Sequence, residues 1–213
     1  MDLALSSRAA LAESLLAAGP DAPTLCEGWS ARHLAAHLVL REHSVWAAGI
    51  PGGPLNAGME RRLEQMAERA ANPADFAALV RRFAAGPGRL SPFSLPGVDR
   101  AANLLEYFVH TEDVRRAREQ WAPRALETEY EDALWNQLVQ RGGMLLRGAP
   151  TGIILVREGG VRRRVRKGAE SVAVSGGLGE LVMFVHGRGG HALVTLEGSP
   201  EATRSLAGFR PAV

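Results

Sequence analysis

Over the first two thirds of the chain, apolar residues recur every three to four positions, which is the period of amphipathic helices. The expected helices cover residues 3–18, 31–48, 56–71, 73–85, 100–120 and 128–141. Runs rich in Gly and Pro separate several of them. The run at residues 86–97 is long enough to suggest a functional loop. This series of helices predicts a helical domain over residues 1–147.

Apolar positions on three of these helices are expected to face the core. They are Leu5, Leu11, Leu15 and Leu16 on the first helix, Leu34, Leu38 and Val45 on the second, and Tyr130, Leu134, Trp135 and Leu138 on the last. Ser30 precedes the second helix and is a favourable N-cap residue.

From Thr151 the pattern changes to short β-like runs. Strands are expected over residues 152–156, 161–166, 171–174 and 191–196, with a hairpin turn at Glu158-Gly159-Gly160. A short helix is expected over 177–185, and Ser199-Pro200 begins another that ends near Gly208. The sequence therefore predicts a small α+β domain over residues 150–213.

Charge and cysteine content exclude several classes of protein. The net charge of +2 gives no strong field for nucleic acid or acidic membranes. Cys26 is the single cysteine, which excludes a disulfide framework and a Cys-rich metal site. No signal peptide or membrane-spanning run is expected. A cytoplasmic protein that acts on a small molecule, as a monomer or homodimer, fits these features best.

Two groups of residues receive ordinary structural interpretations. Residues 162–167 form a basic strand without aromatic residues, so a solvated edge strand is favoured over a nucleic-acid surface. His186 and His191 flank Gly-rich turns and are interpreted as loop histidines. His43 is expected at the surface.

The strongest chemical signal is the pair Glu106 and His110. Residues four apart lie on one face of a helix, about 5–6 Å apart at Cβ. Apolar neighbours bury part of this face, where an acid and a His need partners. His37, on the second helix, supplies a third ligand if the two helices pack side by side. Two His and a carboxylate suit Zn²⁺, Ni²⁺, Fe²⁺ or Mn²⁺ and leave positions open for water or substrate.

Several neighbouring residues leave alternatives open. His33 is four residues before His37 and is a possible fourth ligand, although its place in the first turn favours exposure. Cys26 is a conceivable nucleophile, but packing is favoured. Asp113 or Arg115 is placed to orient a ligand from behind. Trp46 fits either a pocket mouth or the core.

Residues 29–38, Trp-Ser-Ala-Arg-His-Leu-Ala-Ala-His-Leu, resemble the second-helix motif of the DinB-like metalloproteins. Residues 105–114 are similar to the later ligand pair of that superfamily. The resemblance implies an up-down four-helix bundle with crossover loops. The best match is the mycothiol-dependent maleylpyruvate isomerase group with a related actinobacterial branch. Its zinc set implies metal binding by His37, Glu106 and His110; the carboxylate at 106 favours this group over three-His relatives.

The resemblance extends to residues 177–188, which are similar to the helix and Gly-Arg segment of the group's small α/β domain. There an Arg helps to bind the thiol cofactor, which implies this role for Arg188. His33 departs from the pattern, since an acid or polar residue is more usual there.

The favoured function is that of an enzyme, a mycothiol-dependent isomerase or thiol transferase. A metal-bound thiol would have a lowered pKa and would act as a nucleophile toward an unsaturated or halogenated substrate. The alternatives are a non-catalytic metal-binding or small-ligand-binding protein and a metal-dependent hydrolase. A fourth protein ligand favours the binding protein, and turnover without thiol favours the hydrolase.

Overall fold

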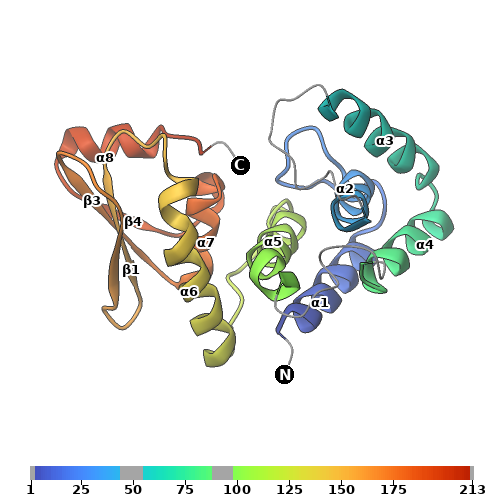
Figure 1. The fold of residues 1–213 in the computed structure, drawn as a ribbon, viewed down its shortest axis with the longest axis horizontal. Helices are drawn as coiled ribbons and strands as arrows, with labels where there is room; N and C mark the ends of the chain where they lie inside the picture. The colour runs from blue at the N-terminus through green and yellow to red at the C-terminus, as the bar shows by residue number, and fades with distance from the viewer. Residues whose placement is uncertain (1–2, 44–54, 88–97, 212–213) are drawn as a thin grey trace. The chain divides into compact units, whose positions relative to one another are not determined.

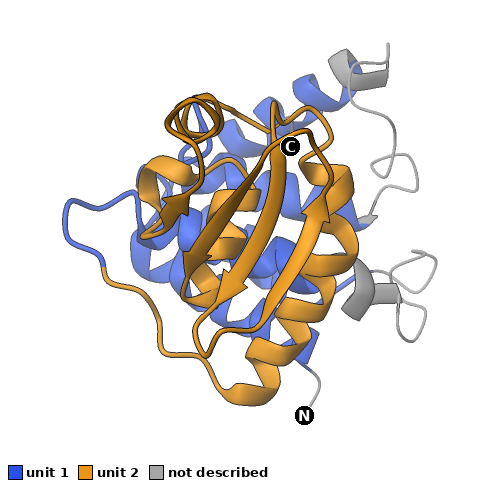
Figure 2. Cartoon of the chain, turned by 90° about the vertical axis from the view of Figure 1, so that its left-hand side faces the viewer, with its two compact units in different colours: residues 1–121 blue, residues 122–213 orange. Residues whose placement is uncertain are grey.

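The computed structural model describes residues 3–43, 55–87 and 98–211. The chain divides into two compact units, residues 1–121 and residues 122–213 (Figures 1 and 2). The first is helical and the second combines helices with a small sheet, so the predicted fold class is confirmed. No helix among the described residues is both long and apolar enough to cross a membrane.

Unit 1 contains five helices within its described residues. They are α1 (Leu3–Ala18), α2 (Ala31–His43), α3 (Leu55–Arg69), α4 (Pro73–Ala84) and α5 (Val98–Arg115). Helix α1 packs along α5, while α2 and α4 contact each other and α4 also contacts α1. Helix α3 lies against α2. This packing brings α2 and α5, the helices with the predicted metal ligands, into one core.

The core face of α1 differs from the prediction. Leu11 and Leu15 are buried as expected, but Leu5 is 58% exposed and Leu16 is 47% exposed. The buried side of this helix includes Arg8 instead. A pattern of apolar residues cannot reveal a buried arginine. The predicted buried face of α1 is therefore rotated about the helix axis relative to the observed one.

A charged cluster explains why Arg8 is buried. Its guanidinium donates to Glu42 Oε2 over 2.5 Å and to the carbonyl of Phe83 over 3.2 Å. The Tyr107 hydroxyl donates to Glu42 Oε1 over 2.5 Å. Each charge is thus paired and hydrogen-bonded, which a buried ion pair requires.

The structure describes only part of the segments that adjoin α2 and α5, so only some of the predictions for them can be compared with it. Val45, Trp46 and most of the loop at 86–97 lie outside the described residues, and so does the side chain of His43. Within the described part, Leu34 and Leu38 are fully buried, as predicted.

Within its described residues, unit 2 consists of a four-stranded sheet and four helical segments. In chain order these are α6 (Thr128–Leu145), β1 (Gly152–Arg157), β2 (Arg162–Arg166), β3 (Ser171–Gly176), α7 (Leu178–Val185), the 3-10 turn η2 (Gly189–His191), β4 (Thr195–Glu197) and α8 (Pro200–Ala207). The strand order is β2-β1-β3-β4, with β1 and β3 parallel and the outer pairs antiparallel. Helices α6 and α7 lie on one face of the sheet (Figure 1).

Helix α6 belongs to unit 2, whereas the sequence analysis placed it in the first domain. A Cβ atom at Gly142 would lie 3.1 Å from the Val165 side chain, and one at Gly143 would lie 3.0 Å from the Val165 carbonyl oxygen. The two glycines therefore let β2 approach the helix closely. They were expected to end the helix near Arg141, but it continues to Leu145.

The structure tests the predictions made for the two outer strands, β2 and β4, and for the start of α8. The basic strand β2 is an edge strand, and Arg162, Arg163 and Arg164 are exposed. Strand β4 spans three residues, not residues 191–196, because the chain first forms the 3-10 turn η2. Ser199 caps α8 by accepting from the Ala202 N–H over 3.2 Å, as its position predicted.

Candidate metal centre

Helix α5 brings an acid and an imidazole together on one face. The Nε2 atom of His110 lies 3.2 Å from Oε1 of Glu106, which is four residues earlier. Helix α2 adds a second imidazole, since His37 Nε2 lies 3.5 Å from the same oxygen. The ligand atoms of these three residues all lie within 4.8 Å of one another. The structure thus assembles the set that the sequence indicated.

The spacing of these atoms fits one divalent ion. Tetrahedral Zn²⁺ with bonds of about 2.0–2.1 Å holds neighbouring ligand atoms about 3.3 Å apart. The observed distances of 3.2 and 3.5 Å lie on either side of that value. The side chains of His37 and Glu106 are 31% and 28% exposed, so an ion and a small ligand have access from solvent.

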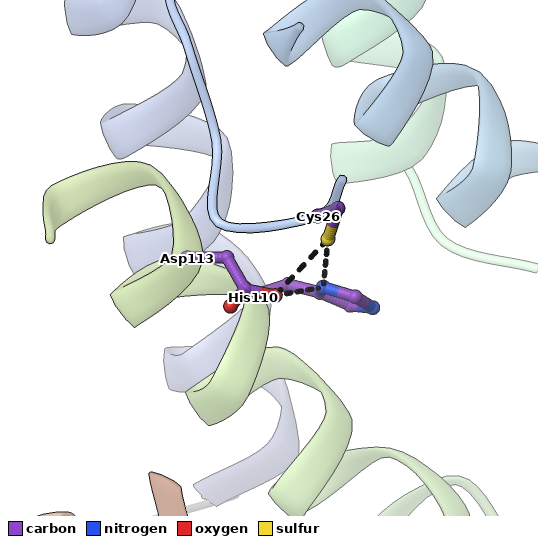
Figure 3. Close-up of side chains that lie close together, drawn as sticks. All are labelled: Cys26, His110 and Asp113. Carbon is purple, nitrogen blue, oxygen red and sulfur yellow. Dashed lines mark hydrogen bonds and ion pairs between the residues drawn. The ribbon is translucent and has the colours of Figure 1, made fainter. Parts of the chain in front are cut away.

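The opposite side of the His110 ring contacts a different set of residues. Its Nδ1 atom lies 2.9 Å from Oδ2 of Asp113, whose side chain is fully buried. The thiol of Cys26 donates to the same oxygen over 3.3 Å and lies 4.0 Å from Nδ1 (Figure 3). Of the two residues expected to orient a ligand, Asp113 contacts His110, whereas Arg115 donates to Glu112 over 2.7 Å.

Two more side chains border the centre. The ring of Trp29 lies 5.2 Å from the ring of His37, between centroids, with the two planes tilted by 46°. Arg41 Nε lies 3.3 Å from Glu106 Oε1, and its guanidinium also donates to Asn103. Arg41 is not among the predicted site residues, although its place four residues after His37 on one helix face is a usable signal.

The charge states of the metal-free site follow from these contacts. Burial raises the pKa of Glu106, but hydrogen bonds to His110 and His37 outweigh it and hold that pKa well below its usual range. Burial lowers the pKa of His37, and its hydrogen bond to Glu106 offsets this only in part. Burial also acts to lower the pKa of His110, but hydrogen bonds to Asp113, Cys26 and Glu106 raise it well above the ordinary value.

The remaining candidates lie elsewhere. His33 Nδ1 is 2.8 Å from the Ser30 hydroxyl and its Nε2 is 3.6 Å from Glu64, so it is not part of the three-ligand cluster. Arg188 belongs to unit 2, where its guanidinium donates to the His186 carbonyl over 2.6 Å. His191 is exposed, in the turn that follows.

Comparison with known proteins gives matches in sequence and in structure. The profile of the mycothiol maleylpyruvate isomerase N-terminal domain matches residues 2–115, just over half of the chain. None of the curated proteins matches the chain. Two solved structures are similar: the mycothiol-dependent maleylpyruvate isomerase (18% identity, TM-score 0.56) and its histidine-to-alanine mutant (17%, 0.58). Each match covers 92% of this chain and 90% of the other. At these identities the structural similarity shows the fold.

Proposed function

Because the chain belongs to the mycothiol maleylpyruvate isomerase N-terminal domain family, we propose that it is a metal-dependent enzyme. It uses mycothiol or another low-molecular-weight thiol to isomerise a small molecule or to transfer the thiol to it. The observation that carries this proposal is the convergence of His37, Glu106 and His110 on one point, with ligand atoms at the spacing of a single ion.

The three residues would hold the ion. We propose zinc, while Ni²⁺, Fe²⁺ and Mn²⁺ accept the same donors. An ion bound there would lower the pKa of a thiol in its open position and supply a thiolate at neutral pH. Among the described residues the cluster has three ligands and His33 is engaged elsewhere. This supports an open position and favours an enzyme over a binding protein with a closed site.

Charge around the centre favours an anionic reactant. Glu106 carries the negative charge of the ligand set, and Arg41 places a positive charge beside it. With a divalent ion the site has a net positive charge, which attracts both a thiolate and a substrate carboxylate. The ring of Trp29 packs against that of His37 and so places apolar surface beside this ligand.

The reaction class follows from thiolate chemistry. A thiolate that adds to a conjugated carbon–carbon double bond converts it to a single bond, about which the substrate rotates. Elimination of the same thiolate then restores the double bond as the other geometric isomer, with no net oxidation or reduction. Addition leaves the negative charge on the conjugated carbonyl group as an enolate. Where this enolate takes up a proton from water instead of eliminating the thiolate, the product is the thiol adduct, so isomerase and thiol transferase share one first step.

Arg188 is proposed to bind the thiol cofactor. Arg188 is half-buried just after α7, where Gly187 with φ +82° follows the last turn of the helix. The turn presents a cation that suits the polar groups of a cofactor. A reduced thiol cofactor and a single cysteine that forms no disulfide both fit a cytoplasmic setting.

The first test is the metal content of the purified protein. We expect close to one equivalent of zinc or a similar ion by elemental analysis, and His110→Ala should lose most of it because two protein ligands remain. A variant that retained the parental metal content would rule out this site. Glu64→Ala is the control, since Glu64 lies beside His33 and outside the cluster.

The second test is the dependence of turnover on thiol. Metal-loaded protein should isomerise an unsaturated keto acid, such as the maleylpyruvate of the similar enzyme, only when mycothiol or a substitute thiol is present. Hydrolysis of an ester substrate without thiol would instead support the hydrolase alternative.

A further inference from the structure

The two nitrogens of His110 have partners at different distances. On the Nε2 side, Glu106 lies 3.2 Å away, near the spacing of two ligands on one ion. On the Nδ1 side, Asp113 Oδ2 lies 2.9 Å away, within the range of a charge-assisted N–H···O hydrogen bond. A ligand imidazole binds its metal through one nitrogen, and the hydrogen bond at the other nitrogen fixes its tautomer and orientation.

We propose that Asp113 is a positioning residue for His110, and that the connector between α1 and α2 holds Asp113 in place. This inference rests on the proposed metal site, which it extends to residues that do not touch the ion. Asp113 Oδ2 accepts a hydrogen bond from Nδ1–H of His110, and this directs Nε2 of His110 toward Glu106 and His37.

The connector fixes both the backbone and the side chain of Asp113. The Leu25 N–H donates to the Asp113 carbonyl over 3.0 Å, and the Cys26 thiol donates to its Oδ2 over 3.3 Å. The connector is itself ordered by Thr24, whose hydroxyl donates to the Trp29 carbonyl over 2.8 Å and accepts the Cys26 N–H over 3.2 Å. The side chain of Asp113 is fully buried, so its carboxylate has a fixed direction.

A competing interpretation is that Cys26, His110 and Asp113 bind a metal themselves, since their ligand atoms also lie within 4.8 Å of one another. The distances argue against it. The pair at 2.9 Å is closer than the roughly 3.3 Å of two ligands on a tetrahedral ion. The thiol is close to the carboxylate, at 3.3 Å, but 4.0 Å from Nδ1. These are the distances of two hydrogen bonds to one carboxylate.

Two adjacent buried carboxylates on α5 provide a matched test. Asp113→Asn should weaken zinc binding by about 10- to 100-fold, because an amide oxygen is a poorer acceptor for Nδ1–H. Glu112→Gln should lower the thermal stability of the metal-free protein but leave the zinc dissociation constant within about twofold of the parent. Glu112 binds Arg115 over 2.7 Å and Arg116 over 2.6 Å, so this variant measures the effect of losing a buried charge alone.

Each quantity is measured on the full chain, by chelator competition for zinc and by thermal unfolding of the metal-free protein. If the parent protein binds no zinc, the proposed function itself fails. If the parent binds zinc and Asp113→Asn binds it equally well, the metal site stands and Asp113 has no positioning role. An equal loss of zinc affinity in both variants would also overturn the inference, because it would show a general effect of helix damage.

Substitutions of Cys26 distinguish hydrogen bonding to Asp113 from metal binding by Cys26, His110 and Asp113. Cys26→Ser keeps a hydrogen-bond donor to Oδ2 of Asp113. Cys26→Ala removes that donor and leaves the contact between this oxygen and His110 Nδ1. Cys26→Ser should therefore bind zinc within about threefold of the parent, whereas Cys26→Ala should weaken zinc binding by about three- to tenfold, because Asp113 loses one of the contacts that hold it. A loss of 100-fold or more in Cys26→Ala would make the thiol a metal ligand and would overturn the assignment of Asp113 as a hydrogen-bond partner only.

Discussion

At the scale of single residues, Glu106 contacts three other side chains of the site at once. One of its oxygens lies within 3.5 Å of nitrogen atoms from His37, Arg41 and His110. In the proposed function, an ion at this oxygen would take over the role that the two imidazoles play in the metal-free protein. Proton binding and metal binding at these residues would then compete.

This competition predicts a pH dependence of metal affinity. Despite burial, hydrogen bonds to Asp113, Cys26 and Glu106 raise the pKa of His110 well above the ordinary value of about 6.5. Nε2 must lose its proton before it binds an ion, so affinity should rise with pH until the pH exceeds this raised pKa. Zinc dissociation constants at pH 6, 7 and 8 should decrease steadily. Equal values at pH 6 and pH 8 would contradict the prediction.

At the scale of elements, the candidate ligands were easier to predict from the sequence than the packing of the helices around them. Glu106 and His110 could be paired because both lie on one helix at a spacing of four, and His37 followed from its apolar stripe. Asp113 was recognised only as one of two options, because spacing along α5 does not show which side chain turns toward His110. The approach of Cys26 depends on the connector's turns, which have no period to detect.

For helix α6, too, the sequence pattern does not show which elements pack against it. Its apolar positions Leu134 and Leu138 are buried as predicted, but periodicity does not show which neighbour buries them. Gly142 and Gly143, which the pattern predicts at the end of α6, are the points where β2 contacts the helix. A Gly in a helix indicates either a break or a close approach, and only the neighbouring chain distinguishes the two.

Two helical glycines provide a matched prediction of stability. Gly143→Ala should destabilise the protein by about 1–3 kcal/mol despite the higher helix propensity of Ala, because the added methyl group meets the Val165 carbonyl oxygen at 3.0 Å. Gly58→Ala in α3 should be neutral or stabilising by up to about 1 kcal/mol, since a Cβ there meets nothing within 4 Å. Urea unfolding measures both. Stabilisation by both substitutions would show that β2 does not pack on α6 as described.

At the scale of the whole molecule, the two units have separate tasks in the proposed function. Unit 1 contains every candidate metal ligand, and unit 2 contains Arg188. The succession from helical periodicity to short strands was readable in the sequence, and so was the fold class. The boundary was misplaced because α6 has the helical pattern of unit 1 but the packing partners of unit 2.

This division predicts that thiol binding and metal binding can be separated. Arg188→Ala should weaken thiol binding, by about tenfold for a lost charge-assisted hydrogen bond, and leave the metal content unchanged. Calorimetric titration of the zinc-loaded protein with thiol measures the first quantity, and elemental analysis measures the second. Arg163→Ala on the exposed edge strand is a control for the loss of one positive charge. Equal thiol affinity in the Arg188 variant and the parent would remove this residue from the cofactor site.

The most direct test of the metal centre is the anomalous scattering of crystals grown with one equivalent of zinc, recorded on both sides of the zinc absorption edge. The account predicts a single peak about 2.0–2.2 Å from Nε2 of His37, an oxygen of Glu106 and Nε2 of His110. A peak bound by Cys26, Asp113 and Nδ1 of His110, or no peak near α2 and α5, would contradict it.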